Sequence, residues 1–96
     1  MYILVTYDVD TTNKAGARRL RHVAKACMDY GHRVQNSVFE CELTEAQYCM
    51  LKERIKEIIE ESLDNIRFYI LNKNDNRRVE VLGVETAYKL YDTIII

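Results

Sequence analysis

Two carboxylates stand at the end of an apolar stretch near the start of the chain. The sequence YILVTYDVDTTNK runs from residue 2 to residue 14 and contains Asp8 and Asp10. Placing carboxylates there gains no apolar burial, so a chemical role deserves a test. Carboxylate oxygens are hard ligands, and Mg²⁺ needs only one or two of them because it keeps several waters. Asp8 therefore predicts a site for Mg²⁺ or Mn²⁺, to which Asp10 could add a second carboxylate.

A single chain offers few ligands for such an ion, so the expected site needs a second copy of the chain. A twofold axis near the strand end would bring in a second Asp8. A metal shared across that axis could lower the pKa of bound water for attack on a phosphodiester. The alternative is that Asp8 or Asp10 only caps the turn into the helix that follows. The residues alone leave both roles open.

Charge is divided unevenly between two segments of this chain. Residues 14–33 contain six basic side chains and one acid, whereas residues 40–64 contain eight acids and three basic side chains. The formal net charge of −1 therefore hides a positive end and a negative end. We expect the positive end to contact nucleic-acid phosphates, which give affinity without sequence preference. Its candidate residues are Lys14, Arg18, Arg19, Arg21 and Lys25.

Periodicity places most of these basic side chains on one side of a helix over residues 14–29. At about 100° per residue, an arc of about 100° holds five polar side chains. They are Lys14, Arg18, Arg21, His22 and Lys25. The apolar stripe opposite them consists of Leu20, Val23, Ala24, Cys27 and Met28. An ordinary solvated face would give a similar pattern, but this one is nearly single-signed.

Several classes of function are disfavoured by the composition. Three glycines leave no Gly-rich phosphate loop, and no aromatic-rich segment for base stacking accompanies the basic residues. Cys27, Cys41 and Cys49 lack C-x-x-C spacing, so we expect small buried side chains without a disulfide. His22 and His32 have no partner at metal-ligand spacing and are expected at the surface. The chain shows neither a bilayer-spanning run nor a secretory signal pattern, which predicts a cytoplasmic protein without membrane contacts.

A strand and a helix must position the candidate ligands. Residues 2–9 alternate in side-chain type and are rich in β-branched and aromatic residues, which predicts a central strand. The capping candidates before the helix of residues 14–29 are Thr11, Thr12 and Asn13. Gly31 is expected to end that helix in the left-handed conformation.

The rest of the chain predicts a second helix and further strands. Residues 33–43 are extended, either as one bent strand or as two short strands folded about residues 35–37. Thr44 and Gln47 have the capping-box spacing at the start of the second helix. The buried stripe of that helix is expected to contain Tyr48, Leu51, Ile55, Ile58 and Ile59. Further strands are expected over residues 66–72, 79–82 and 93–96.

This order of elements predicts an α+β fold in one domain over residues 1–96. Two helices would cover one face of an antiparallel sheet, as in a ferredoxin-like βαββαβ sandwich with an extra C-terminal strand. The other face would show Tyr2, Leu4, Thr6 and Asp8. Because that face is too apolar to stay in water, we expect a homodimer formed face to face. The strand over residues 93–96 is expected to pair with a sheet edge.

Three stretches of the sequence resemble a known family. They are VTYDV at residues 5–9, YGHRVQNSVFECEL at residues 30–43 and IRFYIL at residues 66–71. Together with the basic helix, they resemble the small CRISPR-associated adaptation proteins, the second of the two universal Cas protein families. The resemblance implies a ferredoxin-like homodimer that bridges two dimers of the CRISPR integrase and holds prespacer DNA. It also implies a metal-dependent endonuclease that acts on single-stranded RNA or double-stranded DNA.

The resemblance also implies roles for individual residues. The family's metal-binding aspartate falls on Asp8, and the tyrosine beside it falls on Tyr7. The remaining positions of the catalytic group fall on Arg33, Ser37 and Phe39. The basic positions of the first helix fall on Arg18, Arg19 and Arg21. The strand over residues 93–96 resembles the one that pairs across the dimer in this family.

Three functions remain open at this point. The first is a dimeric nucleic-acid-binding scaffold for an integrase, and the second is a Mg²⁺-dependent phosphodiesterase. The third is a non-catalytic regulatory or metabolite-binding dimer, since the ferredoxin-like fold hosts many functions. One carboxylate per chain without an evident general base favours the scaffold over the nuclease, although both can hold together.

Overall fold

The part of the chain that the structure describes forms one sheet and two helices. The computed structural model describes residues 1–71 and 78–84. In chain order the elements are β1 (Tyr2–Asp8), α1 (Lys14–Met28), β2 (Gly31–Gln35), β3 (Val38–Glu42), α2 (Glu45–Ile58), β4 (Asn65–Leu71) and β5 (Arg78–Gly83). The extended segment is therefore two strands, as the second of the two alternatives predicted. The strand expected over residues 93–96 lies outside the described residues.

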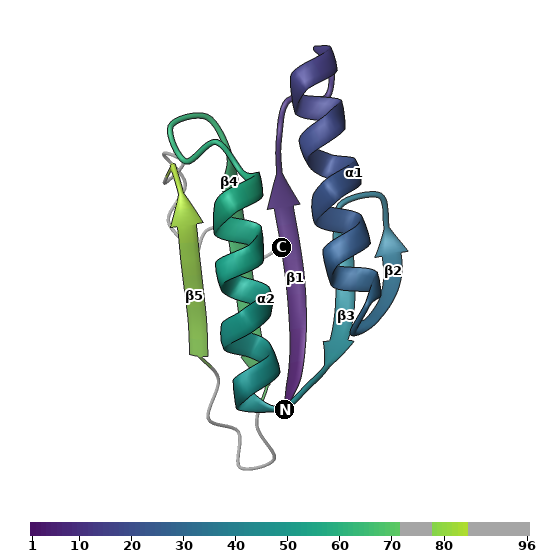
Figure 1. Ribbon diagram of the computed structural model, residues 1–96, viewed down its shortest axis with the longest axis vertical. Helices are drawn as coiled ribbons and strands as arrows, with labels where there is room; N and C mark the ends of the chain where they lie inside the picture. The colour runs from purple at the N-terminus through teal and green to yellow at the C-terminus, as the bar shows by residue number, and fades with distance from the viewer. Residues whose placement is uncertain (72–77, 85–96) are drawn as a thin grey trace, which may run out of the picture.

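All five strands pair antiparallel, in the order β2-β3-β1-β4-β5. The helices α1 and α2 lie side by side on one face of this sheet (Figure 1). The first four strands and the two helices have the βαββαβ order of a ferredoxin-like fold, and β5 extends the sheet beyond β4. The predicted α+β fold is confirmed. Neither of the two described helices is long and apolar enough to cross a membrane.

Strand β1 lies at the centre of the sheet and alternates as its sequence predicts. Ile3 and Val5 are fully buried beneath the helices, and Tyr7 is nearly so. On the opposite face, Tyr2 is 40% exposed and Asp8 is exposed. The helices therefore cover one face, while no described helix or strand covers the face that carries Tyr2 and Asp8.

Local hydrogen bonds explain where the helices begin. The Asn13 side chain caps α1 by accepting from the Gly16 N–H at 2.7 Å. Thr44 and Gln47 form the predicted capping box at the start of α2, with N–H···O distances of 2.9 and 3.1 Å. Each bond satisfies an N–H that the first turn of a helix leaves unpaired.

Three of the predictions about individual residues are wrong. Met28 is 48% exposed because it lies at the rim of the α1 stripe, whose centre passes through Val23 and Cys27. Cys49 is exposed on α2, whereas Cys27 and Cys41 are buried as free thiols. Gly31 does not adopt the left-handed conformation but begins β2. A Cβ at Gly31 would lie 1.8 Å from the Glu40 carbonyl oxygen, so close approach of β3 explains the glycine.

Candidate functional site

Asp8 is the last residue of the central strand. It pairs with Asn65 of β4 at one end of the sheet, and its side chain is exposed. No ion pair in the described part of the chain involves Asp8. Its carboxylate is therefore presented to solvent at a rigid position, without an internal cation to neutralise it.

Asp10, and not Asp8, makes hydrogen bonds within the turn that leads into α1. Its Oδ1 accepts from the Thr12 N–H at 2.9 Å and from the Thr12 hydroxyl at 2.6 Å. These hydrogen bonds lower the pKa of Asp10, and the bond from the Thr12 hydroxyl has the larger effect. Asp10 thus stabilises the turn and Asn13 caps the helix, so neither task requires Asp8.

Asp8 and Asp10 line the same shallow depression. Its volume is about 250 Å³, and the remaining lining residues are Val9, Leu63, Asn65 and Val84. Across residues 1–71 and 78–84, no group of three or more His, Cys, Asp or Glu side chains could hold a metal ion. One chain therefore fits a cation only through one or two carboxylates with water completing the shell, which is the kind of coordination that Mg²⁺ accepts.

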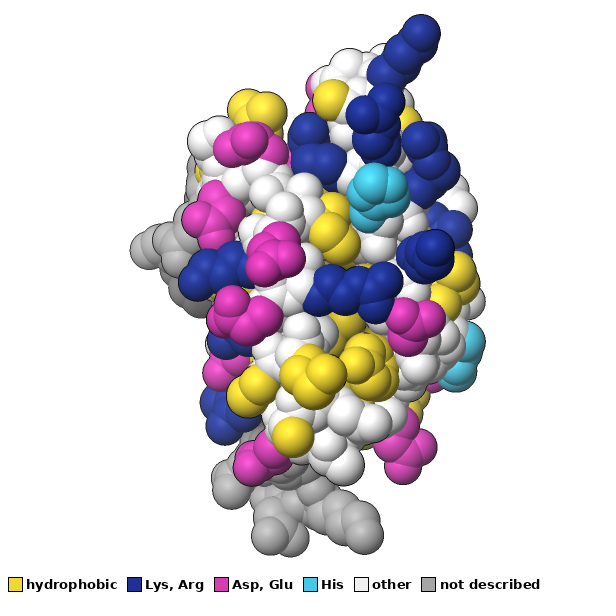
Figure 2. Space-filling model, viewed as in Figure 1, with side chains coloured by type: hydrophobic (Ala, Val, Ile, Leu, Met, Phe, Trp, Pro, Cys, Tyr) yellow, Lys and Arg dark blue, Asp and Glu magenta, His cyan; other side chains and the backbone are white. Residues whose placement is uncertain are grey.

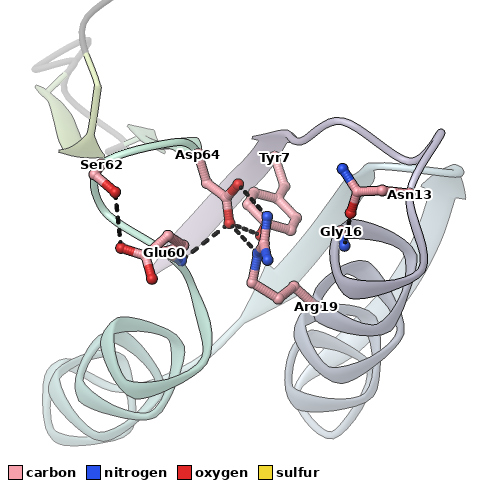
Figure 3. Close-up of polar contacts among 7 residues, drawn as sticks. All are labelled: Tyr7, Asn13, Gly16, Arg19, Glu60, Ser62 and Asp64. Atoms are coloured by element: carbon pink, nitrogen blue, oxygen red, sulfur yellow. Dashed lines mark hydrogen bonds and ion pairs between the residues drawn. The ribbon is translucent and has the colours of Figure 1, made fainter.

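A buried carboxylate, Asp64, lies beneath this end of the sheet. Its side chain is 1% exposed and accepts from Arg19 Nε at 2.7 Å and Arg19 Nη2 at 3.0 Å. Asp64 also accepts from the Tyr7 hydroxyl and, at 3.1 Å, from the Glu60 N–H (Figure 3). Asp64 thus joins β1, α1 and the loop between α2 and β4.

Hydrogen bonding controls the protonation of this cluster. Burial by itself would raise the pKa of Asp64, but the bonds from Arg19, Tyr7 and the Glu60 N–H outweigh burial, and its pKa is lowered. Burial and the bond to Asp64 raise the pKa of Tyr7, so its hydroxyl stays protonated at neutral pH. The pair Arg19 and Asp64 is therefore ionised, with Tyr7 as a neutral donor.

In this cluster, two of the predicted site residues have structural contacts with a buried carboxylate. Tyr7 is 3% exposed, so its hydroxyl holds Asp64 and does not face solvent. Arg19 points inward because it lies one heptad before the buried Ala26, on the same side of α1. The structure therefore separates Arg19 from the outer basic arc and places both residues where they can fix Asp8 relative to α1.

The other basic residues of α1 do form an outer face. Lys14, Arg18, Arg21 and Lys25 are exposed, as is His22 among them. Figure 2 shows Lys and Arg side chains gathered over α1, while most Asp and Glu side chains of this view lie over α2. The predicted division into a positive and a negative side is thus present on the folded surface.

The last three predicted site residues lie on the β2–β3 hairpin. Arg33 is exposed and donates from Nε and Nη2 to the Asn36 carbonyl, at 2.8 and 2.6 Å. Its guanidinium lies 5.6 Å from the ring centre of Phe39, which is fully buried. The Ser37 carbonyl accepts from the Tyr7 N–H at 2.9 Å. The hairpin turn is therefore fixed at the same end of the sheet as Asp8.

Asp64 itself was not among the predicted site residues. In the sequence it is one of eight acids in the negative segment. The available signal was its position directly before the apolar strand NIRFYIL, where an acid must either face solvent or find a partner. Only the fold shows that the partner is Arg19, which is distant in sequence.

A ferredoxin-like fold with an exposed strand-end aspartate beside a basic helix defines a small α+β protein suited to contacts with phosphates. Residues 1–79 match the family described as CRISPR associated protein Cas2. The chain belongs to this family, which confirms the resemblance seen in the sequence.

Individual relatives are similar over nearly their full length. A Rhodospirillum rubrum protein named CRISPR-associated endoribonuclease Cas2 3 is 52% identical over 94 residues, covering 98% of this chain and 99% of the relative. A Halalkalibacterium halodurans protein named CRISPR-associated endonuclease Cas2 is 45% identical over 95 residues, covering 99% of each. The crystal structure of Streptococcus pyogenes Cas2 at pH 6.5 is 61% identical with a TM-score of 0.74, covering 86% of this chain and 100% of that one.

Proposed function

We propose that this Cas2-family chain is a homodimer that binds nucleic-acid backbones along α1 and hydrolyses phosphodiesters at Asp8. In CRISPR adaptation, the same dimer serves as the scaffold that holds prespacer DNA between integrase dimers. The observation that carries this proposal is the exposed Asp8 carboxylate, which no ion pair in the described residues neutralises, at the end of β1 beside a helix with a nearly single-signed basic face.

Asp8 is the residue that would hold Mg²⁺ or Mn²⁺. When bound, such an ion acts as a Lewis acid toward the phosphate and lowers the pKa of a bound water. The chain itself fixes the position of the carboxylate. Strand β1 is central in the sheet, Asp10 stabilises the turn that follows it, and the Asp64 cluster connects it to α1. The hydroxyl of Tyr7 supports this arrangement from the buried side.

A second copy of the chain is expected to cover the bare face of the sheet. Tyr2 and Leu4 of β1 pair directly with Leu71 and Tyr69 of β4, so these four side chains lie on the same face. Tyr2 and Leu71 are each 40% exposed within one chain. Burying this face against its twofold copy would remove apolar surface from water and bring in a second Asp8.

The substrate class follows from the kind of contact available. Lys and Arg side chains on α1 can contact phosphates of either RNA or DNA without reading the bases. Among the relatives, one is named an endoribonuclease and another an endonuclease. We therefore propose both single-stranded RNA and duplex DNA as substrates.

The phosphate contacts along α1 can be measured from the salt dependence of duplex binding. If Arg18 and Arg21 each contact one phosphate, the variant Arg18→Gln/Arg21→Gln should reduce the slope of log K against log salt by about 1.8. Because both side chains are exposed, the midpoint of thermal unfolding should stay close to that of the wild type. An unchanged slope in this variant would contradict the placement of nucleic acid on α1.

A further inference from the structure

A groove runs between α1 and α2 on the outer side of the molecule. Its volume is about 410 Å³, and its lining residues are His22, Lys25, Arg54, Glu57 and Ile58. The first two belong to the basic face of α1, whereas Arg54 comes from α2. In Figure 2 the area of Lys and Arg side chains continues from α1 into the space between the two helices. The basic surface is therefore not confined to one helix.

Arg54 is held toward α1 by an ion pair. Its Nη1 lies 2.7 Å from Oδ2 of Asp29, the C-cap residue directly after α1. The two side chains are 43% and 56% exposed, so the pair lies in water. Exposed pairs of this kind contribute little to stability. An anion that enters the groove can therefore replace the Asp29 carboxylate as the partner of Arg54 with little loss of stability.

We propose that this groove binds a backbone phosphate of nucleic acid, with Lys25 and Arg54 as the charged donors and His22 as a further N–H donor. The proposal rests on the proposed function, because it extends the phosphate path of α1 onto α2, a helix with three acidic and three basic side chains. Arg54 can bind a phosphate through two N–H groups at once, which a lysine cannot do.

Two acids near the groove, Glu57 and Asp29, oppose phosphate binding. Glu57 lines the groove, and Asp29 competes with phosphate for Arg54. Release of counterions from the nucleic acid favours the exchange of Asp29 for phosphate at low salt. The groove should therefore contribute to binding as a salt-dependent contact, and removing Asp29 should strengthen that contact.

The test compares Arg54→Gln with Lys56→Gln in binding to a short DNA duplex over a range of salt concentrations. Lys56 is an exposed cation of the same helix that does not line the groove. Arg54→Gln should reduce the slope of log K against log salt by about 0.9, and Lys56→Gln should leave it unchanged. Asp29→Asn should tighten binding by up to about fivefold in the wild-type background. The same change made in the Arg54→Gln variant should tighten binding by less. Thermal unfolding of each variant checks that the fold is intact.

The outcomes separate this proposal from the one on which it rests. A slope that falls for Arg18→Gln/Arg21→Gln but not for Arg54→Gln would overturn the groove and leave the α1 interface standing. Equal losses in Arg54→Gln and Lys56→Gln would also overturn it, since any surface cation would then act alike. A wild-type protein that fails to bind the duplex would overturn the proposed function together with the groove.

Discussion

Replacing Asp8 with Asn should lower metal-dependent cleavage of labelled RNA and duplex DNA by at least about 100-fold. Asn keeps the size of the side chain but removes the charge that would hold the cation, and several kcal/mol of charge stabilisation correspond to factors of this order. Because Asp8 is exposed and makes no ion pair within residues 1–71 and 78–84, stability should change little. Gel assays with Mg²⁺ and with chelator measure the loss directly.

Asp10→Asn is the matched control for this variant. Asp10 lies two residues further along, is also exposed and lines the same depression. An Asn at this position can still accept the hydrogen bonds from Thr12. Activity close to that of the wild type is therefore expected for Asp10→Asn. Equal cleavage by the wild type and by Asp8→Asn would show either that the cutting comes from a contaminant or that Asp8 has no part in it.

Asp64→Asn should destabilise the protein by about 3 kcal/mol. Removing one partner of a buried ion pair leaves the other charge unpaired, at a typical loss of about 3–5 kcal/mol. The lower end applies here because Arg19 is 18% exposed and can regain water. For a chain of this size, the loss corresponds to a fall of roughly 12–24 °C in the midpoint of thermal unfolding. Tyr7→Phe removes only a neutral donor and should lose about 1 kcal/mol.

The pH dependence of unfolding provides a second readout for Asp64. Its pKa in the folded protein is below the ordinary value of 3.8, so the folded state binds this proton less tightly than the unfolded state. The stabilisation is therefore complete above about pH 5 and is lost as the pH falls through the lowered pKa. The difference in unfolding midpoint between the wild type and Asp64→Asn should shrink below about pH 4. A difference that stays constant down to pH 3 would contradict an ionised Asp64.

Elements specified by local contacts were predictable from the sequence. The alternation of β1 and the capping box of Thr44 and Gln47 depend on residues close together in the chain, and both are confirmed. The ferredoxin-like order of elements follows from their types and sequence. The exposed basic arc of α1 also follows from helical periodicity alone.

Features that depend on neighbours distant in sequence were not predictable. Gly31 sits where β3 approaches the backbone of β2, and helix periodicity contains no sign of that approach. Arg19 looks like its basic neighbours until the fold brings Asp64 to it across 45 positions. Arg54 looks like part of a mixed surface until α2 packs beside α1. In each case tertiary packing, rather than local propensity, gives the residue its role.

The central claim is that two chains together form the working site at Asp8, and mixed dimers test it most directly. Wild-type and Asp8→Asn chains are mixed in equal amounts, allowed to exchange subunits, and assayed for metal-dependent cleavage. If both copies of Asp8 are needed, about a quarter of the wild-type activity should remain, because only that fraction of randomly formed dimers has two wild-type chains. Retention of about half of the activity would show that each chain works alone, which contradicts a site shared across the twofold axis.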